Sequence, residues 1–440
     1  MKRLLGVLVA LAGCEDNSGL VSVTLTTAPG SHVLDDVQTL HVTNTKPLEV
    51  HDVSRTSGGF DLSLDFEPTG EATALLIDGR DASGTVIAAG ASPPFILGPS
   101  DGDIAIYMAA PNSVAASPVM LDPPRSELGV GKLSYGALLA GGRNGSTSAV
   151  DALEIYNAFD HSTVKGLALP APRSSVIVGI GANGIAYLFG GIDESGMATG
   201  TLWRFDTTIA PAGQYIDFGP KSGFERAGEL AVPIGNEHFL VTGSPVADLY
   251  GLGGAIAAKT DLASLPPVGA GLLGTDGVDA AVFADFNGVV RYHAGAFNTV
   301  DAPAGPRNGG SVVALPDGHA VIVCGSALGA GLTEAVRIDV ASGTAQSFSN
   351  VPAQPRTACA ATATSRYLVI AGGVLDSGVA ATTAEIFDAI TLAPVATTPL
   401  VVPRMGAQAI PLPNGQVLIA GGVDMNGAPI ATLELFTPAN

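Results

Sequence analysis

The sequence predicts an all-β protein in two parts, a small pair of packed sheets followed by a series of repeated sheets. Three observations favour this class. Glycine and proline are abundant, with 57 and 30 of the 440 residues, which is typical of chains with many turns. Short segments alternate between apolar and polar residues, as half-buried strands do. Beyond residue 111, an arginine and a glycine that ends an apolar segment recur at a nearly constant separation.

Residues 1–13 have the pattern of an export signal. Residues 1–3 are a short basic start, and the apolar run 4–11 is too short to cross a bilayer as a helix. The segment 11–14, Leu-Ala-Gly-Cys, resembles the lipobox of bacterial lipoproteins. That resemblance implies cleavage before Cys14 and attachment of lipid to its thiol. The alternative is an ordinary cleaved signal peptide followed by an incidental cysteine.

Lipid on Cys14 would hold the protein at a membrane without a transmembrane helix. The polar residues that follow make 14–19 a lipidated tether before folded structure begins. The membrane is then a partner through this lipid. We expect a lipid-anchored protein of the bacterial cell envelope, with the outer membrane favoured over the inner one.

The charge balance excludes one class of partner. Acidic residues outnumber basic residues by 40 to 20, so the formal net charge is −20. Because phosphate backbones are bound by clustered Lys and Arg, we expect no nucleic-acid partner. The same balance argues against electrostatic docking on anionic lipid.

Residues 20–110 are predicted to form a small β-sandwich. The segments 21–26 and 60–66 alternate between apolar and polar residues, whereas 74–77 and 85–89 are more uniformly apolar and enclose a turn-rich segment. Short strands separated by frequent turns are typical of immunoglobulin-like sandwiches, although the Cys…Trp…Cys pattern of antibody domains is missing. We interpret this part as a spacer, with a ligand-binding module as the alternative.

Residues 111–440 contain an internal repeat. In six places an arginine precedes a glycine-ended apolar segment by 17 or 18 residues, and an amphipathic segment follows after a turn. A seventh, degenerate copy spans residues 281–301, in which we take 289–295 as the glycine-ended segment. A period of about 45 to 52 residues with several short strands is typical of propeller blades. The six pairs are Arg125 and Gly142, Arg173 and Gly191, Arg226 and Gly243, Arg307 and Gly325, Arg356 and Gly373, and Arg404 and Gly422.

The paired glycines that end these segments resemble those of kelch repeats. The resemblance extends over most of residues 111–440 and implies a seven-bladed kelch-like β-propeller there. The fourth-strand tryptophan of that family is absent, and the single Trp203 is expected on a third strand. The matching pairs are Gly141-Gly142, Gly190-Gly191, Gly372-Gly373 and Gly421-Gly422, and weaker copies stand at Gly243 and Gly325.

The last repeat is one strand short. The chain ends soon after the third segment of this unit, near Phe436. We expect residues 114–121 to supply the missing fourth strand and to join the two ends of the ring, which leaves no long sheet edge open. We interpret the repeated arginines as structural, with Glu154, Glu385 and Glu434 as candidate ion-pair partners.

Cys324 and Cys359 have two interpretations. An exported compartment permits disulfides, and lipidation of Cys14 leaves an even number of cysteines. Neighbouring blades approach one another near the axis, so a disulfide between the two is one interpretation. The alternative is a pair of small buried thiols. Neither makes them catalytic, because copper oxidases with kelch-like propellers have their cross-linked cysteine before or within the first two blades.

The remaining polar motifs do not converge on a reaction. Turns that begin at Asp193, Asp376 and Asp424 have residues found in Ca²⁺ loops, but the same residues are typical of tight turns, which we favour. We therefore expect no metal and no cofactor. Four histidines are interpreted as turn residues that face solvent, namely His161, His238, His293 and His319.

A regular scaffold without convergent titratable residues favours a monomeric, non-catalytic binding protein for a protein or glycan ligand. One alternative is a carbohydrate-active enzyme, such as a lyase, isomerase or oxidase. Another is a structural component of the cell envelope. A propeller mouth lined by Gly, Ala and Thr would favour binding, whereas one lined by His, Tyr, Arg and acidic side chains would favour an enzyme.

Overall fold

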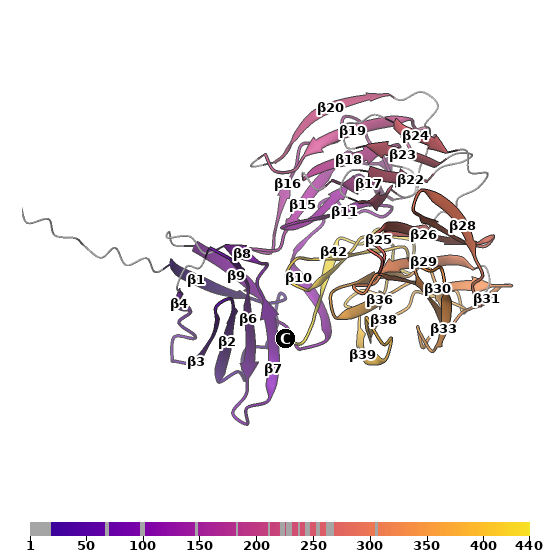
Figure 1. The fold of residues 1–440 in the computed structure, drawn as a ribbon. Helices are drawn as coiled ribbons and strands as arrows, with labels where there is room; N and C mark the ends of the chain where they lie inside the picture. Colours follow the sequence, from indigo (N-terminus) through magenta and orange to yellow (C-terminus); the bar gives the residue numbers. More distant parts are fainter. Residues whose placement is uncertain are drawn as a thin grey trace, which may run out of the picture.

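The computed structural model describes residues 19–66, 70–96, 102–145, 148–181, 184–209, 212–220, 225, 231–235, 238–242, 247–251, 256–260, 268–303 and 307–440. In this part of the chain every regular element is a strand, which confirms the all-β class (Figure 1). None of these residues forms a helix that could cross a membrane. The predicted signal peptide and Cys14 lie outside the described residues.

The strands between residues 19 and 107 form two sheets that share one core. β1 lies between β4, which is antiparallel to it, and β9, which is parallel. The second sheet has the order β3-β2-β6-β7, and apolar side chains from both sheets, such as Val21 and Ile77, pack together. The strands are β1 (Gly19–Thr26), β2 (Thr39–Thr45), β3 (Leu48–Ser54), β4 (Ser63–Phe66), β6 (Leu75–Arg80), β7 (Val86–Ala91), β9 (Gly102–Tyr107) and the short pair β5 (Ala72–Thr73) and β8 (Phe95–Ile96).

From residue 113 onward, the described strands form seven large antiparallel sheets, six of four strands and one of five, which we number 1 to 7 in chain order. Sheets 1 to 3 contain β11 (Gly129–Leu133), β12 (Gly136–Ala140), β15 (Leu153–Asn157) and β16 (Ser162–Lys165); β17 (Ile177–Ile180), β18 (Ile185–Phe189), β19 (Thr201–Asp206) and β20 (Gln214–Pro220); and β21 (Ala231–Ile234), β22 (His238–Val241), β23 (Ala247–Gly251) and β24 (Ile256–Thr260).

Sheets 4 to 6 contain β25 (Val268–Leu273), β26 (Asp279–Asp285), β27 (Gly288–His293) and β28 (Ala296–Val300); β29 (Asn308–Ala314), β30 (His319–Ala327), β32 (Glu334–Asp339) and β33 (Ala345–Ser349), with the added β31 (Ala330–Gly331); and β35 (Ala360–Ala363), β36 (Tyr367–Ala371), β38 (Thr383–Asp388) and β39 (Pro394–Pro399). Two short ribbons lie beside them, β13 (Arg143–Asn144) with β14 (Ser148–Ala149), and β34 (Arg356–Thr357) with β37 (Val374–Leu375).

Sheet 7 combines the two ends of this region. It contains β40 (Gln408–Pro411), β41 (Val417–Ala420) and β42 (Thr432–Thr437), and its fourth strand is β10 (Ser113–Met120). β10 is antiparallel to β42, with Val114 opposite Phe436. The expectation that residues 114–121 complete the last sheet is confirmed.

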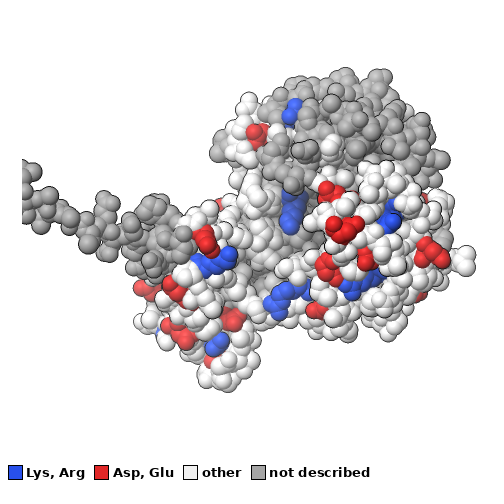
Figure 2. Space-filling view, viewed as in Figure 1, with Lys and Arg blue, Asp and Glu red and all other residues white. Residues whose placement is uncertain are grey.

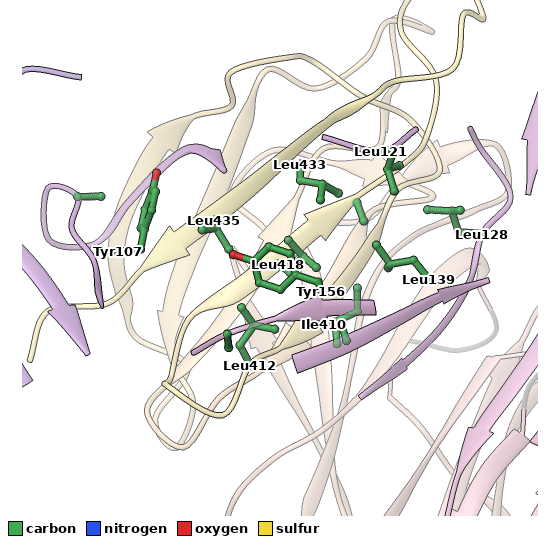
Figure 3. Close-up of a cluster of buried hydrophobic side chains, with 14 residues drawn as sticks. Tyr107, Leu121, Leu128, Leu139, Tyr156, Ile410, Leu412, Leu418, Leu433 and Leu435 are labelled. Carbon is green, nitrogen blue, oxygen red and sulfur yellow. The ribbon is translucent and has the colours of Figure 1, made fainter. Parts of the chain in front are cut away.

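The first strands of the sheets contact one another in cyclic order. β11 contacts β17, and contacts continue through β21, β25, β29, β35 and β40, which in turn contacts β11. Apolar side chains fill the space between neighbouring sheets. Between sheets 1 and 7, for example, Leu139 and Tyr156 pack with Leu418 and Leu435 (Figure 3).

Each of these sheets has two ends, which we call the turn end and the arginine end. The turn end is where first strands turn into second strands, as at Ser134 and Tyr135, and the arginine end is the opposite one. The two packed sheets contact the turn end. The backbone N–H of Ala105 donates to Phe159 O at 2.9 Å, and Nδ2 of Asn440 donates to Ile77 O at 3.0 Å.

The second of the paired glycines is required by close backbone contacts. Gly422 has a φ of +84°, and a Cβ there would lie 2.6 Å from Met405 O. Gly142 has a φ of +112° and would place a Cβ 2.7 Å from Ser126 O. A side chain at either position would clash with the arginine-bearing segment, which explains why the glycine and the arginine recur together.

The strand assignment of the degenerate repeat was wrong by one strand. Residues 281–284 belong to β26, the second strand of sheet 4, and the segment taken as a glycine-ended second strand, 289–295, contains the third strand β27. The first strand of this sheet is β25, whose sequence Val-Gly-Ala-Gly-Leu-Leu has no arginine ahead of it in the repeat pattern. Because the arginine that marks the other repeats is missing here, the second and third strands of this sheet were taken as the first and second.

Candidate binding site

Three of the repeated arginines form buried ion pairs within their own sheets. Nη1 of Arg125 lies 2.8 Å from Oε1 of Glu154, and both side chains are buried. Arg356 pairs with Glu385, and Arg404 with Glu434, in the same way. These pairings confirm the carboxylate partners expected from the sequence. All six side chains of these pairs are buried, so they serve the interior of the sheets.

Each glutamate also holds the loop that precedes its arginine. Glu434 accepts the backbone N–H of Val401 at 2.8 Å, and Glu385 accepts that of Ala353 at 2.6 Å. Burial lowers the pKa of Arg404, and the negative charge of Glu434 opposes this shift. The arginine, the glutamate and the loop therefore form one structural unit at the arginine end.

Sheets 2 and 5 lack this glutamate, and their arginines have other partners. In sheet 2, Trp203 stands where Glu154 stands in sheet 1, and Arg173 lies over its ring at 5.4 Å. In sheet 5, Arg307 is 3% exposed and donates to Cys324 O at 3.1 Å and Glu334 O at 2.8 Å. Burial lowers the pKa of Arg307 to about 10. Arg226 and Gly243 lie outside the described residues.

The histidines do not form a common site. The expectation that His161 faces solvent is wrong, because it is 1% exposed, and its Nδ1 lies 2.8 Å from the Tyr156 hydroxyl. Burial lowers the pKa of His161 to about 4. His293 and His319 each lie beside an aspartate of a nearby turn, Asp276 at 2.9 Å and Asp317 at 3.2 Å.

The Asp-rich loops at the arginine end are tight turns, as expected. The Asp193 carboxylate accepts the backbone N–H groups of Ser195 at 2.9 Å and Met197 at 3.0 Å. Asp424 accepts those of Asn426 and Ala428 in the same way. Hydrogen bonds of this kind, led in the first case by the Ser195 hydroxyl, lower the pKa of both carboxyl groups. Within the described residues there is no group of three metal-ligating side chains.

The two cysteines link neighbouring sheets. In the structure Cys324, on β30 of sheet 5, and Cys359, just before β35 of sheet 6, form a disulfide with their Cα atoms 6.5 Å apart. Both residues are buried. The disulfide therefore joins two sheets in the interior, and neither cysteine lines the cavities described next.

Three cavities lie among the first strands. The largest, which we call the turn-end cavity, has a volume of about 710 Å³ and is bordered by six of the seven first strands. A second, the side cavity, has about 380 Å³ and shares Lys132 and Pro233 with it. A third, of about 330 Å³, opens at the arginine end beside Glu127.

Small and apolar residues make up most of the turn-end cavity. Lys132, on β11, is the one charged residue among the described residues that line it. Thr362, Thr364 and Ser365 contribute hydroxyl groups. The other lining residues are Pro233, Ala270, Gly271, Val312, Val313, Ala314, Leu315, Pro316, Ala361, Ala363, Pro411, Leu412, Pro413 and Gly415.

The side cavity also has polar lining residues. It is lined by His238 and Tyr135 together with Thr207 and Thr208. The Tyr135 hydroxyl donates to Thr207 O at 2.7 Å, and burial raises the pKa of Tyr135. The hydrogen bond of this phenol is thus committed to a backbone carbonyl.

Sequence reasoning did not single out Lys132. The signal was present, because Lys132 is the only charged residue in the seven first strands of the sheets. It could be recognised only after β25 and the other first strands had been assigned. On the molecular surface, acidic and basic side chains are interspersed over the face shown in Figure 2.

No family model matches this chain. No curated protein matches it either. Among solved structures, one described as "Structure of YjhT" is similar over 73% of this chain and 96% of that chain, with a TM-score of 0.46 and 16% sequence identity.

Proposed function

We propose that this protein is a lipid-anchored, exported binding protein of the bacterial cell envelope. Residues 111–440 act as a seven-bladed kelch-like β-propeller that binds a protein or glycan ligand without catalysis. The cyclic contacts from β11 through β40 and back to β11 support the propeller. The pairing of β10 with β42 supports its closure.

One observation carries the choice of binding over catalysis. The turn-end cavity is lined mainly by Gly, Ala, Val, Pro and Thr, with Lys132 as its one charged residue among those described. General acid–base chemistry needs at least one group that can exchange a proton near neutral pH within reach of the substrate. Concave pockets with a few polar groups are instead typical of ligand recognition.

The two packed sheets act as a spacer of immunoglobulin-like type. β1 begins at Gly19, five residues after Cys14, so these sheets would stand between the lipid and the propeller. They contact the turn end, and a cavity of about 230 Å³ there is lined by Leu76 and Ala91 from the spacer and by Tyr367 from sheet 6. A ligand in the turn-end cavity would thus lie close to the spacer.

A binding screen tests this function. The full chain carrying Cys14→Ser, which lacks the proposed lipid site, is applied to arrays of glycans and bacterial surface proteins. We expect a saturable signal that is lost when Thr362→Trp fills the turn-end cavity, with the circular dichroism spectrum unchanged. Turnover of an arrayed sugar would overturn the non-catalytic function, and a signal that survives the filled cavity would overturn the site.

A further inference from the structure

We infer that the turn-end cavity takes a small organic anion, with the ammonium group of Lys132 facing its negative charge. This inference rests on the proposed binding function and names the ligand class for the same site. Lys132 is the one charged side chain among the described residues around a cavity of about 710 Å³. Volumes of roughly 300 to 1,000 Å³ are typical of small-molecule sites.

Lys132 has no partner within the part of the chain that the structure describes. It forms no ion pair or hydrogen bond there and is exposed toward the cavities. Lys165, by contrast, lies 2.6 Å from the Asp122 carboxylate. A cation that is left without a carboxylate in a chain with net charge −20 is available to an external anion.

Hydroxyl groups near Lys132 are also uncommitted. Ser134, which lines the side cavity, and Thr362 and Ser365, which line the turn-end cavity, make no side-chain hydrogen bond to other described residues. Such hydroxyls can donate to the oxygens of a carboxylate or of a polyhydroxylated molecule. An organic anion with several oxygens therefore fits this lining better than an apolar ligand does.

The opposite end of the propeller has the opposite charge. The arginine-end cavity has Glu127 as its one charged residue among those described. Its Oε2 lies 3.4 Å from Nε of Arg143, so this carboxylate has a partner. The described lining of the arginine-end cavity therefore offers an anion no unpaired cation, unlike Lys132 at the turn end.

Saturation-transfer NMR with the full chain carrying Cys14→Ser tests the inference. The probes are glucuronate and glucose, which differ by one carboxylate, and inorganic phosphate. We expect glucuronate to bind about fivefold more tightly than glucose, the size of effect of one partly exposed ion pair. At equal concentrations, phosphate should displace glucuronate only partly, because it lacks the hydroxyls that the lining can bind.

Two variants identify the residue. Lys132→Gln should remove the preference for glucuronate, and Lys132→Glu should reverse it, whereas Lys165→Gln removes the same charge elsewhere and should leave the preference unchanged. Equal binding of both sugars, full displacement by an equal concentration of phosphate, or a preference that persists in Lys132→Gln would overturn the inference.

The array separates this inference from the proposed function. An array ligand that Lys132→Glu still binds would leave the binding function standing and overturn the anion site. An absence of both array signals and glucuronate binding would overturn the two together.

Discussion

The guanidinium of Arg404 and the carboxylate of Glu434 form an ion pair in which neither side chain is exposed to solvent. The glutamate also accepts two backbone N–H groups, those of Val401 and Val402. Burying two charges is favourable only when both are paired and hydrogen-bonded, as they are here. The pair therefore makes the loop and the third strand of sheet 7 dependent on each other.

Removing one partner of this ion pair should destabilise the protein more than replacing both partners. Arg404→Leu leaves the Glu434 carboxylate buried without its cation, and we expect a loss of about 3–5 kcal/mol in the free energy of unfolding. The double variant Arg404→Leu with Glu434→Leu should lose less than Arg404→Leu alone or Glu434→Leu alone. Urea unfolding monitored by circular dichroism measures all three. A single-variant loss below that of the double variant would contradict the buried pair.

His161 should make the stability depend on pH. Burial holds the pKa of His161 at about 4 in the folded state, below its ordinary value of 6.5. The unfolded chain therefore binds a proton first as the pH falls, so the stability is complete above pH 6.5 and declines toward pH 4. Between pH 7 and pH 5 the loss should be about 2 kcal/mol. His161→Gln should flatten this part of the curve, and an unchanged slope would refute the assignment.

A matched pair of glycines tests the close approach at the arginine end. Gly422→Ala places a Cβ 2.6 Å from Met405 O, whereas Gly427→Ala meets nothing within 4 Å, and both glycines have positive φ. The strain of positive φ, roughly 1 kcal/mol, applies to both, and the clash applies only to the first. We expect Gly422→Ala to lower the unfolding temperature clearly further. Equal effects would show that the backbone conformation alone selects glycine.

The disulfide between Cys324 and Cys359, which joins sheets 5 and 6, should leave neither cysteine as a free thiol. Cys324 and Cys359 enclose 35 residues, and removing a disulfide around a loop of that length costs about 3–4 kcal/mol in the chain-entropy account. In the Cys14→Ser chain, unfolded without reductant, thiol titration should find no free cysteine. Serine at both positions should lower the unfolding temperature. Two titratable thiols would instead support the buried-thiol interpretation.

The lipid anchor is tested in cells. If Cys14 carries lipid, the wild-type protein should sediment with the membrane fraction and require detergent for release. Cys14→Ser should appear in the soluble fraction after export. Palmitate labelling of the wild type, absent from the variant, checks the chemistry directly, and sedimentation of the variant with membranes would argue against the anchor.

The repeat could be predicted from the sequence because its markers are imposed by packing. An arginine and a glycine coincide where a loop crosses a sheet, and in sheets 1, 6 and 7 a glutamate joins them, as Glu154 joins Arg125 and Gly142. The fourth strand of sheet 7 followed from the shortage of one segment near Phe436. Where a marker is lost, as ahead of β25, the strand order could not be assigned correctly.

The side-chain environments were harder to predict, because they depend on segments distant in the sequence. His161 follows Asp160 in a turn, which suggests exposure, yet Tyr107 from β9 packs against its ring at 5.5 Å. Lys132 alternates with buried residues in β11, an ordinary pattern for a half-exposed strand. Its role as the charge of a cavity depends on five other first strands that surround the same space.

The partnership of β10 with β42 has a consequence for how the chain reaches its native state. Ser113 is synthesised long before its neighbour Thr437, so sheet 7 has the largest loop to close and its completion should be a late, slow step. A circular permutant that starts at β11 and carries residues 19–121 after Asn440 would turn this pairing into a local one. It should refold faster than the natural order of segments.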